Sequence, residues 1–139
     1  MLAQLLNTVE WSLKDLGRLL FQPSSREQML EEIDRLGAQL QQRCAELTRS
    51  QRELAGVKRR LRDHPTAAAL LHSRIETMLR KGQSEQAWRA ALELDQLRQS
   101  LAADRETCPR LEQRCWSLHF HIRQLQRRLD RVLERLSPS

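Results

Sequence analysis

The sequence of 139 residues contains no tyrosine and only two phenylalanines, four glycines and four prolines. Compact globular domains use aromatic side chains in their cores and glycine and proline in their many turns. The scarcity of these residues, beside 40% hydrophobic and 30% charged residues, argues against such a fold and indicates long helices. The length predicts a single domain.

The chain also lacks a long apolar segment. No run approaches the roughly 18 consecutive apolar residues that cross a bilayer, so we expect no transmembrane span. The N-terminus has neither the early positive region nor the small-residue cleavage motif of a secretory signal. The three cysteines have no CxxC spacing, and their odd number favours a reducing compartment.

Motifs that carry chemistry are missing as well. There is no glycine-rich phosphate loop, no GxSxG and no HExxH. Cys115 and His119 are four residues apart and could share a helix face, but no second pair of ligands accompanies them, so we expect no metal site. We therefore expect neither an enzyme nor a cofactor, and no small-molecule substrate.

What the sequence does contain is two long heptad runs of nearly equal length, separated by a short break at Lys81, Gly82, Gln83 and Ser84. This pattern predicts an all-α fold with a long antiparallel coiled-coil helical hairpin over residues 26–136, its tip near 81–84 and a frayed tail at 137–139. The seam is the set of positions at which each helix faces the other. Its predicted residues are Ile33, Leu36, Leu40, Leu47, Leu54, Val57, Leu61, Leu94, Leu97, Leu101, Leu111, Leu118, Ile122, Leu125 and Leu129.

Several residues modify this hairpin. Gly82 suits the left-handed end of the first helix, and Ser84 suits the N-cap of the second. Pro65 and Pro109 interrupt the two arms, and we expect kinks there because a proline inside a helix loses a hydrogen bond. The polar seam residues, which predict a poorly sealed middle in an isolated hairpin, are Arg43, Ser50 and Asp104.

Residues 1–22 predict a separate amphipathic helix, joined to the hairpin by a linker at 23–25. Such a helix can lie in a membrane interface, and it can equally dock on the hairpin or on a neighbouring subunit. The residues alone leave both possibilities open. The leucine-rich stripe, which spans an arc of roughly 100° at 3.6 residues per turn, consists of Leu2, Leu5, Leu6, Val9, Leu13, Leu16 and Leu20.

The net charge of +6 suggests an anionic partner such as lipid headgroups or nucleic acid. Basic residues cluster at 58–62 and again at 123–135. Arginine and glutamate on the exposed positions of a coiled coil are also ordinary solvation. Nucleic acid is the less favoured partner, because the sequence has no zinc finger, helix-turn-helix or basic-zipper layout.

The order of these elements resembles the phage shock protein A / vesicle-inducing protein (Vipp1, IM30) family, the bacterial relatives of ESCRT-III. An amphipathic helix is followed by a proline linker at Phe21-Gln22-Pro23 and then by a long helix. The stretch from Leu79 to Leu92 is similar to the family's basic turn followed by Leu-Ala-Arg-x-Ala-Leu. A long heptad return arm completes the likeness, which covers nearly the whole chain.

The resemblance implies a peripheral membrane-binding scaffold that assembles through its hairpin and stabilises or remodels membranes. It implies that the stripe of residues 1–21 faces lipid, and that the protein is cytoplasmic, at the inner face of the membrane. Family members continue into further helices that clasp neighbouring subunits, whereas the given sequence ends at Ser139. We therefore expect a homo-oligomer or co-assembly with a longer relative.

Two other functions fit the same residues. The heptads and the basic surface are compatible with a soluble coiled-coil adaptor or stalk, for example of a secretion apparatus, which would form a small oligomer and bind no lipid. The basic clusters are compatible with a polyanion binder, whose affinity would depend steeply on salt. We rank the membrane scaffold first, the adaptor second and the polyanion binder third.

Overall fold

The computed structural model of the chain describes residues 25–137, and these form two α-helices and no strand. Helix α3 spans Ser25–Arg80, and helix α4 spans Ser84–Leu136. The predicted all-α helical hairpin is confirmed in this part of the chain. The predicted amphipathic helix at 1–22 lies outside the described residues. Helix α3 begins at Ser25, which the sequence assigns to the linker.

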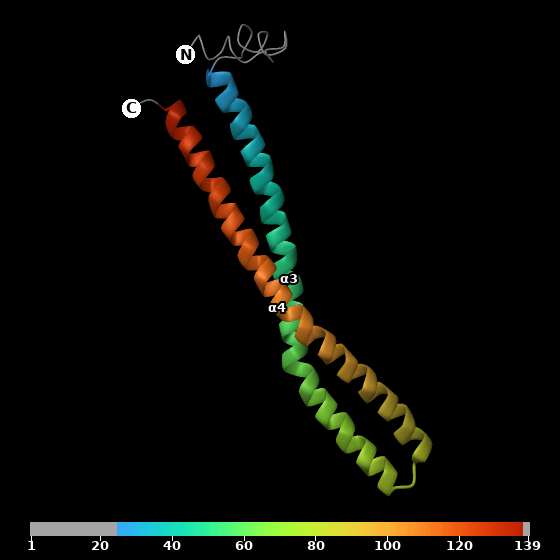
Figure 1. Cartoon of the computed structure of the whole chain (residues 1–139). Helices are drawn as coiled ribbons and strands as arrows, with labels where there is room; N and C mark the ends of the chain where they lie inside the picture. Colours follow the sequence, from blue (N-terminus) through green and yellow to red (C-terminus); the bar gives the residue numbers. More distant parts are fainter. Residues whose placement is uncertain (1–24, 138–139) are drawn as a thin grey trace, which may run out of the picture. The chain divides into compact units, whose positions relative to one another are not determined.

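The described chain divides into two compact units. In the larger unit, residues 39–126, α3 and α4 lie side by side, run in opposite directions and are joined at the tip (Figure 1). The other unit contains residues 25–38 of α3 and residues 127–137 of α4. There, Nη2 of Arg128 lies 3.9 Å from Oε1 of Glu32, an ion pair between the two helices.

All fifteen predicted seam residues are at least partly buried, because a seven-residue repeat returns to the same face of a helix. Helix α4 is the better covered of the two. The buried predicted residues are Leu36, Val57, Leu94, Leu101, Leu111, Leu118, Ile122 and Leu125. The half-buried ones are Ile33, Leu40, Leu47, Leu54, Leu61, Leu97 and Leu129.

The tip is a short turn at residues 81–83, and Gly82 has a φ of 73° as predicted for the left-handed end of a helix. The amide of Gln83 donates to the carbonyl of Met78 at 2.9 Å, and the amide of Gly82 donates to Leu79 at 3.1 Å. These two bonds satisfy carbonyls at the end of α3. The tip position requires glycine because a side chain rarely adopts this conformation.

The predicted N-cap of the second helix is wrong by one residue. The amide of Ala87 donates to the carbonyl of Gln83 at 3.0 Å, so Gln83 accepts the first hydrogen bond of α4. Ser84 is therefore already the first helical residue. Serine favours the N-cap position because its hydroxyl oxygen can accept a hydrogen bond from a backbone amide of the first turn. The tight glycine turn instead brings Gln83 into that position.

Both arms remain helical through their prolines, Pro65 in α3 and Pro109 in α4. Each proline lacks the amide that would bond the residue four positions earlier. Both lie on the exposed face of their helix, where water can hydrate the released carbonyl. The heptad pattern continues past each of them, so the prolines do not interrupt the seam.

Candidate functional site

A charged pair crosses the seam between the two helices near the middle of the larger unit. Asp104 occupies a seam position of α4 and is only 7% exposed. Arg60 of α3 reaches it with two hydrogen bonds, from Nε to Oδ2 at 2.9 Å and from Nη2 to Oδ1 at 3.1 Å. This bidentate arrangement is the strong form of an arginine–carboxylate contact. The hydrogen bonds and the charge of Arg60 hold the pKa of Asp104 below its usual range.

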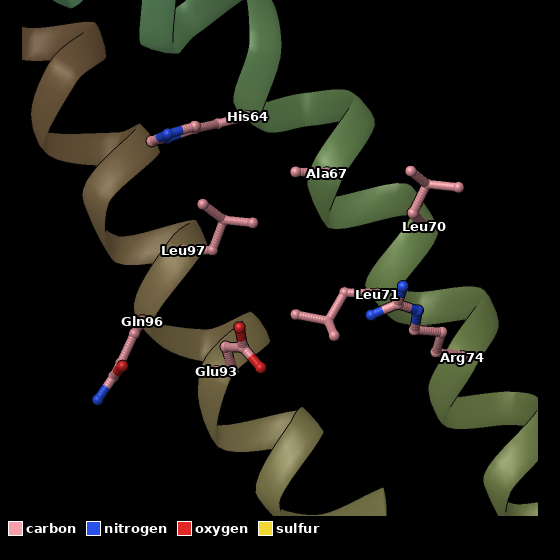
Figure 2. A pocket seen from close by; sticks show the side chains of 8 residues that line it. All are labelled: His64, Ala67, Leu70, Leu71, Arg74, Glu93, Gln96 and Leu97. Carbon is pink, nitrogen blue, oxygen red and sulfur yellow. The ribbon is translucent and has the colours of Figure 1, made fainter.

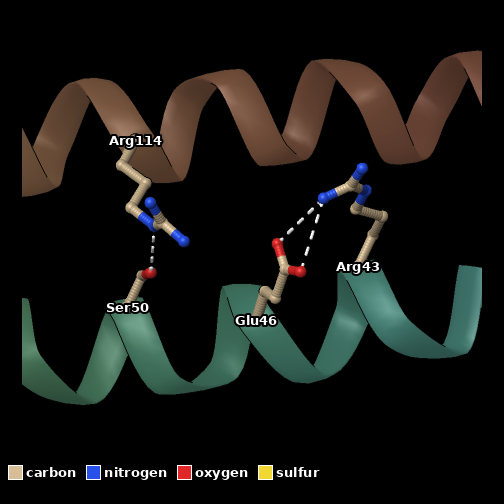
Figure 3. Close-up of polar contacts among 4 residues, drawn as sticks. All are labelled: Arg43, Glu46, Ser50 and Arg114. Atoms are coloured by element: carbon tan, nitrogen blue, oxygen red, sulfur yellow. Dashed lines mark hydrogen bonds and ion pairs between the residues drawn. The ribbon is translucent and has the colours of Figure 1, made fainter.

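A second polar layer lies further from the tip, in residues 43–50 of α3 and the facing part of α4 (Figure 3). Nε of Arg114 donates to Oγ of Ser50 across the seam at 3.2 Å, and Ser50 is only 5% exposed. Arg43 pairs instead with Glu46 on its own helix, at 3.1 Å between Nη1 and Oε2. This ion pair lies within α3 and does not cross the seam, and Arg43 remains half-buried.

The structure therefore corrects the prediction of a poorly sealed middle. Ser50 and Asp104 are buried and each is hydrogen-bonded to the opposite helix. A polar side chain at a seam position does not open the seam when an arginine from the facing helix satisfies it. Such pairs also favour one alignment of the two helices, because sliding either helix would leave a buried polar group unpaired.

The Arg60–Asp104 pair predicts acid-sensitive stability. The folded-state pKa of Asp104 is lowered, so its contribution is fully present above the unfolded pKa and is lost as the pH falls below about 4. Asp104→Asn should be less stable than the parent at neutral pH, and the difference should shrink at pH values well below 4. Urea unfolding at both pH values checks this.

Asp63→Asn is the matched control, because Asp63 pairs with Arg62 at 3.0 Å on an exposed surface. Exposed pairs contribute little to stability, so this variant should follow the parent at both pH values. A stability difference for Asp104→Asn that does not change with pH would contradict the account.

The poorly filled part of the seam lies beyond Pro65, between His64 and the tip. The α3 seam residues there are only half-buried, and Leu70 on the adjoining face is 64% exposed. An open groove of about 560 Å³ lies between the helices (Figure 2). Nδ1 of His64 is buried there without a hydrogen-bond partner. The groove is lined by His64, Ala67, Leu70, Leu71, Arg74, Glu93, Gln96 and Leu97.

The groove is open because the side chains of the two facing stretches do not fill the space between them. Ala67 contributes only a methyl group to the lining, and Leu70 is largely exposed, so the stretch of α3 that faces Glu93 and Leu97 leaves space unfilled. The sequence interpretation ended the α3 seam at Leu61, although the same spacing continues through Pro65. The seam residues missed in this way are Ala68, Leu71, Ile75 and Met78.

Large apolar side chains also lie exposed on the outer faces of both helices. Four of the five on α4 form two pairs, Trp88 with Leu92 and Trp116 with Phe120, with the same spacing of four residues and four heptads between the pairs; the fifth is Leu133. The sequence interpretation did not single them out, because they lie away from the seam. Their signal was the presence of tryptophan at a solvent-facing heptad position, since apolar patches on a surface commonly mark interaction sites.

The remaining predicted positions have the following outcome. The stripe from Leu2 to Leu20 lies outside the described residues, so its orientation stays a prediction. Cys115 is buried, and Cys108 is half-buried. The burial of Cys108 raises the pKa of its own thiol, and the charge of Glu112 adds a smaller increase. Within residues 25–137 no group of three or more histidine, cysteine or acidic side chains could hold a metal ion. In the same range no helix combines the length and hydropathy needed to cross a membrane.

Comparison with known proteins does not assign a family. No protein-family model, curated protein or solved structure matches the chain. The resemblance to the phage shock protein A family therefore rests on the order of elements and the tip sequence alone.

Proposed function

We propose that this chain is a peripheral membrane-binding scaffold of the phage shock protein A / ESCRT-III-like type. Residues 1–22 bind the bilayer, and the helical hairpin assembles with other copies or with a longer relative. The protein acts by covering and stabilising or remodelling membrane rather than by catalysis. Its site of action is the cytoplasmic face of the membrane.

The observation that carries this proposal is the exposed apolar surface of the hairpin. Trp88 and Trp116 are 66% and 69% exposed, and the other large apolar side chains with high exposure include Leu70, Leu79 and Phe120. Large apolar groups on the outer faces of a two-helix hairpin cost stability in water unless another surface covers them. Neighbouring hairpins would provide such a surface, and this supports assembly as the role of the hairpin.

Co-sedimentation with vesicles of phosphatidylcholine and phosphatidylglycerol tests the membrane part of the proposal. The full chain should pellet with the vesicles, and a chain lacking residues 1–22 should remain in the supernatant. Replacing Leu6 and Leu13 with serine removes two large apolar groups from the stripe and should lower vesicle binding about tenfold or more.

The matched control replaces Gln4 and Asn7 with serine, on the polar side of the same predicted helix, and should bind as the parent does. Equal pelleting of the full and shortened chains would overturn the proposal. A small oligomer of defined size that ignores vesicles would favour the adaptor function instead. Binding to nucleic acid that weakens steeply with salt would favour the polyanion function.

A further inference from the structure

Helix α4 carries a stacked aromatic pair on its outer face. The rings of Trp116 and Phe120 lie 5.9 Å apart between centroids and are nearly parallel, with 7° between their planes. They are 69% and 53% exposed, so the stack shields only part of each ring from water. The pair presents a continuous apolar surface about one helical turn long.

The charge that follows this pair along α4 is basic, and the acid one turn before it, Glu112, is paired with Lys58 at 3.5 Å. Arg123 lies seven residues after Trp116, on the same face of α4, and is exposed. It makes no ion pair or hydrogen bond within residues 25–137. Between Glu112 and Asp130 the sequence of α4 contains no acidic residue at all. We call Trp116, Phe120 and Arg123 the aromatic patch.

A surface of the opposite character lies near the beginning of α3. Leu30 is 47% exposed, and Glu31 and Asp34 are exposed beside it, within an arc of about 100°. Neither acid makes an ion pair or hydrogen bond in the described part of the chain. The neighbouring Glu32, by contrast, lies 3.8 Å from Arg35 and 3.9 Å from Arg128. We call Leu30, Glu31 and Asp34 the acidic patch.

We propose that the aromatic patch of one copy binds the acidic patch of a second copy. Each patch combines exposed apolar surface with charge, and the two charges are opposite in sign. Docking would cover Trp116 and Phe120 with Leu30 and place Arg123 beside Glu31 and Asp34. Buried aromatic residues carry most of the affinity of typical interfaces, and complementary charges select the partner and its orientation.

The two patches differ, so the contact is heterologous: every copy retains one free patch of each kind. Such contacts continue into rings or open-ended filaments rather than stopping at a dimer. The inference rests on the proposed self-assembly of the hairpin and specifies which surfaces meet. Its occupant is a second copy because the acidic patch would be repelled by an anionic bilayer and by nucleic acid.

Sedimentation velocity of the full chain, with and without anionic vesicles, tests the aromatic half of the contact. Trp116→Ala combined with Phe120→Ala should raise the concentration needed for assembly about tenfold or more. Ser117→Ala combined with His121→Ala is the matched control, because this exposed pair has the same spacing on α4 and lies outside the aromatic patch. The control should assemble within about twofold of the parent, as expected for residues outside the energetic centre of an interface.

A charge exchange tests the pairing of the two patches. Arg123→Glu and Asp34→Arg should each weaken assembly, and the two together should restore it, because the exchange rebuilds an opposite-charge pair with its sign reversed. Both positions are exposed. Circular dichroism of each variant confirms that the helices are retained, so that weaker assembly reports on the contact.

The outcomes separate this contact from the scaffold function. Failure of the parent chain to assemble under any of these conditions would overturn both. If the parent assembles and the Trp116/Phe120 variant assembles equally well, or the charge exchange fails to restore assembly, the contact is wrong while the scaffold function stands. Loss of vesicle binding by that variant without loss of assembly would make the aromatic patch a lipid contact and overturn the inference.

Discussion

Replacing Leu94 with alanine is expected to lower the free energy of unfolding by about 2–4 kcal/mol, as for other buried leucines. Leu94 is 6% exposed and lies on the seam of α4, within the stretch whose residues Glu93 and Leu97 line the open groove. The substitution removes apolar contacts and adds to an incompletely filled seam. Urea unfolding followed by circular dichroism measures the change.

Leu92→Ala is the matched control, because Leu92 lies two residues away on the same helix and is 49% exposed. The same substitution there should change the free energy of unfolding by no more than about 0.5 kcal/mol. Both variants should be measured at a concentration below that of assembly, since assembly stabilises the folded chain. Equal effects of the two substitutions would contradict the assignment of the seam.

Replacing Asp104 with leucine is expected to raise the free energy of unfolding by about 1–2 kcal/mol. Leucine adds apolar burial at a seam position, and exchanging a buried charged pair for packed apolar groups is often neutral or stabilising. The partner, Arg60, has a side chain that is 46% exposed, so it can turn to water when Asp104 is replaced. Urea unfolding again provides the measurement.

Asp104→Asn serves as the comparison, because it keeps the shape of the side chain and removes the charge. It should destabilise the hairpin at neutral pH while Asp104→Leu stabilises it. A leucine variant less stable than the asparagine variant would show that the Arg60 contact contributes more than apolar packing at this position. The pair would then stabilise the hairpin more than a packed leucine does, in addition to favouring one alignment of the two helices.

The helical hairpin could be predicted from the sequence because its two determinants are local. A seven-residue repeat identifies the buried face of each helix without knowledge of the partner, and Gly82 marks the reversal between the two described helices. Pro65 was interpreted as an interruption of the first arm, so the continuation of that repeat toward the tip was missed. Recognising that Pro65 lies on the outer face would have shown that the seam continues past it.

The quality of the seam could not be predicted in the same way. Whether Ser50 or Asp104 opens the interface depends on which arginine of the other helix can reach it, and this is set by the alignment of residues more than 40 positions apart. The groove near Leu70 likewise depends on the sizes of side chains on two facing stretches. A heptad pattern identifies which positions face the other helix. Whether the space there is filled, and whether a polar group there is hydrogen-bonded, depends on which residues of the two helices lie opposite each other.

The outer surface was the part of the candidate site that sequence reasoning treated least. The charged residues were considered through the net charge and through clusters of basic residues. The apolar residues of the hairpin were considered only as seam positions. The exposed pair Trp116 and Phe120 belongs to neither group, and the opposite character of the Leu30 surface becomes apparent only when unpaired acids are distinguished from paired ones. Both surfaces lie on faces that a hairpin alone leaves to solvent.

Negative-stain electron microscopy of the full chain, with and without vesicles of phosphatidylcholine and phosphatidylglycerol, tests the central claim most directly. The scaffold account predicts repeating rings, rods or coats built from the chain and attached to the vesicle surfaces. Small discrete particles that look the same in both samples and leave the vesicles bare would contradict it.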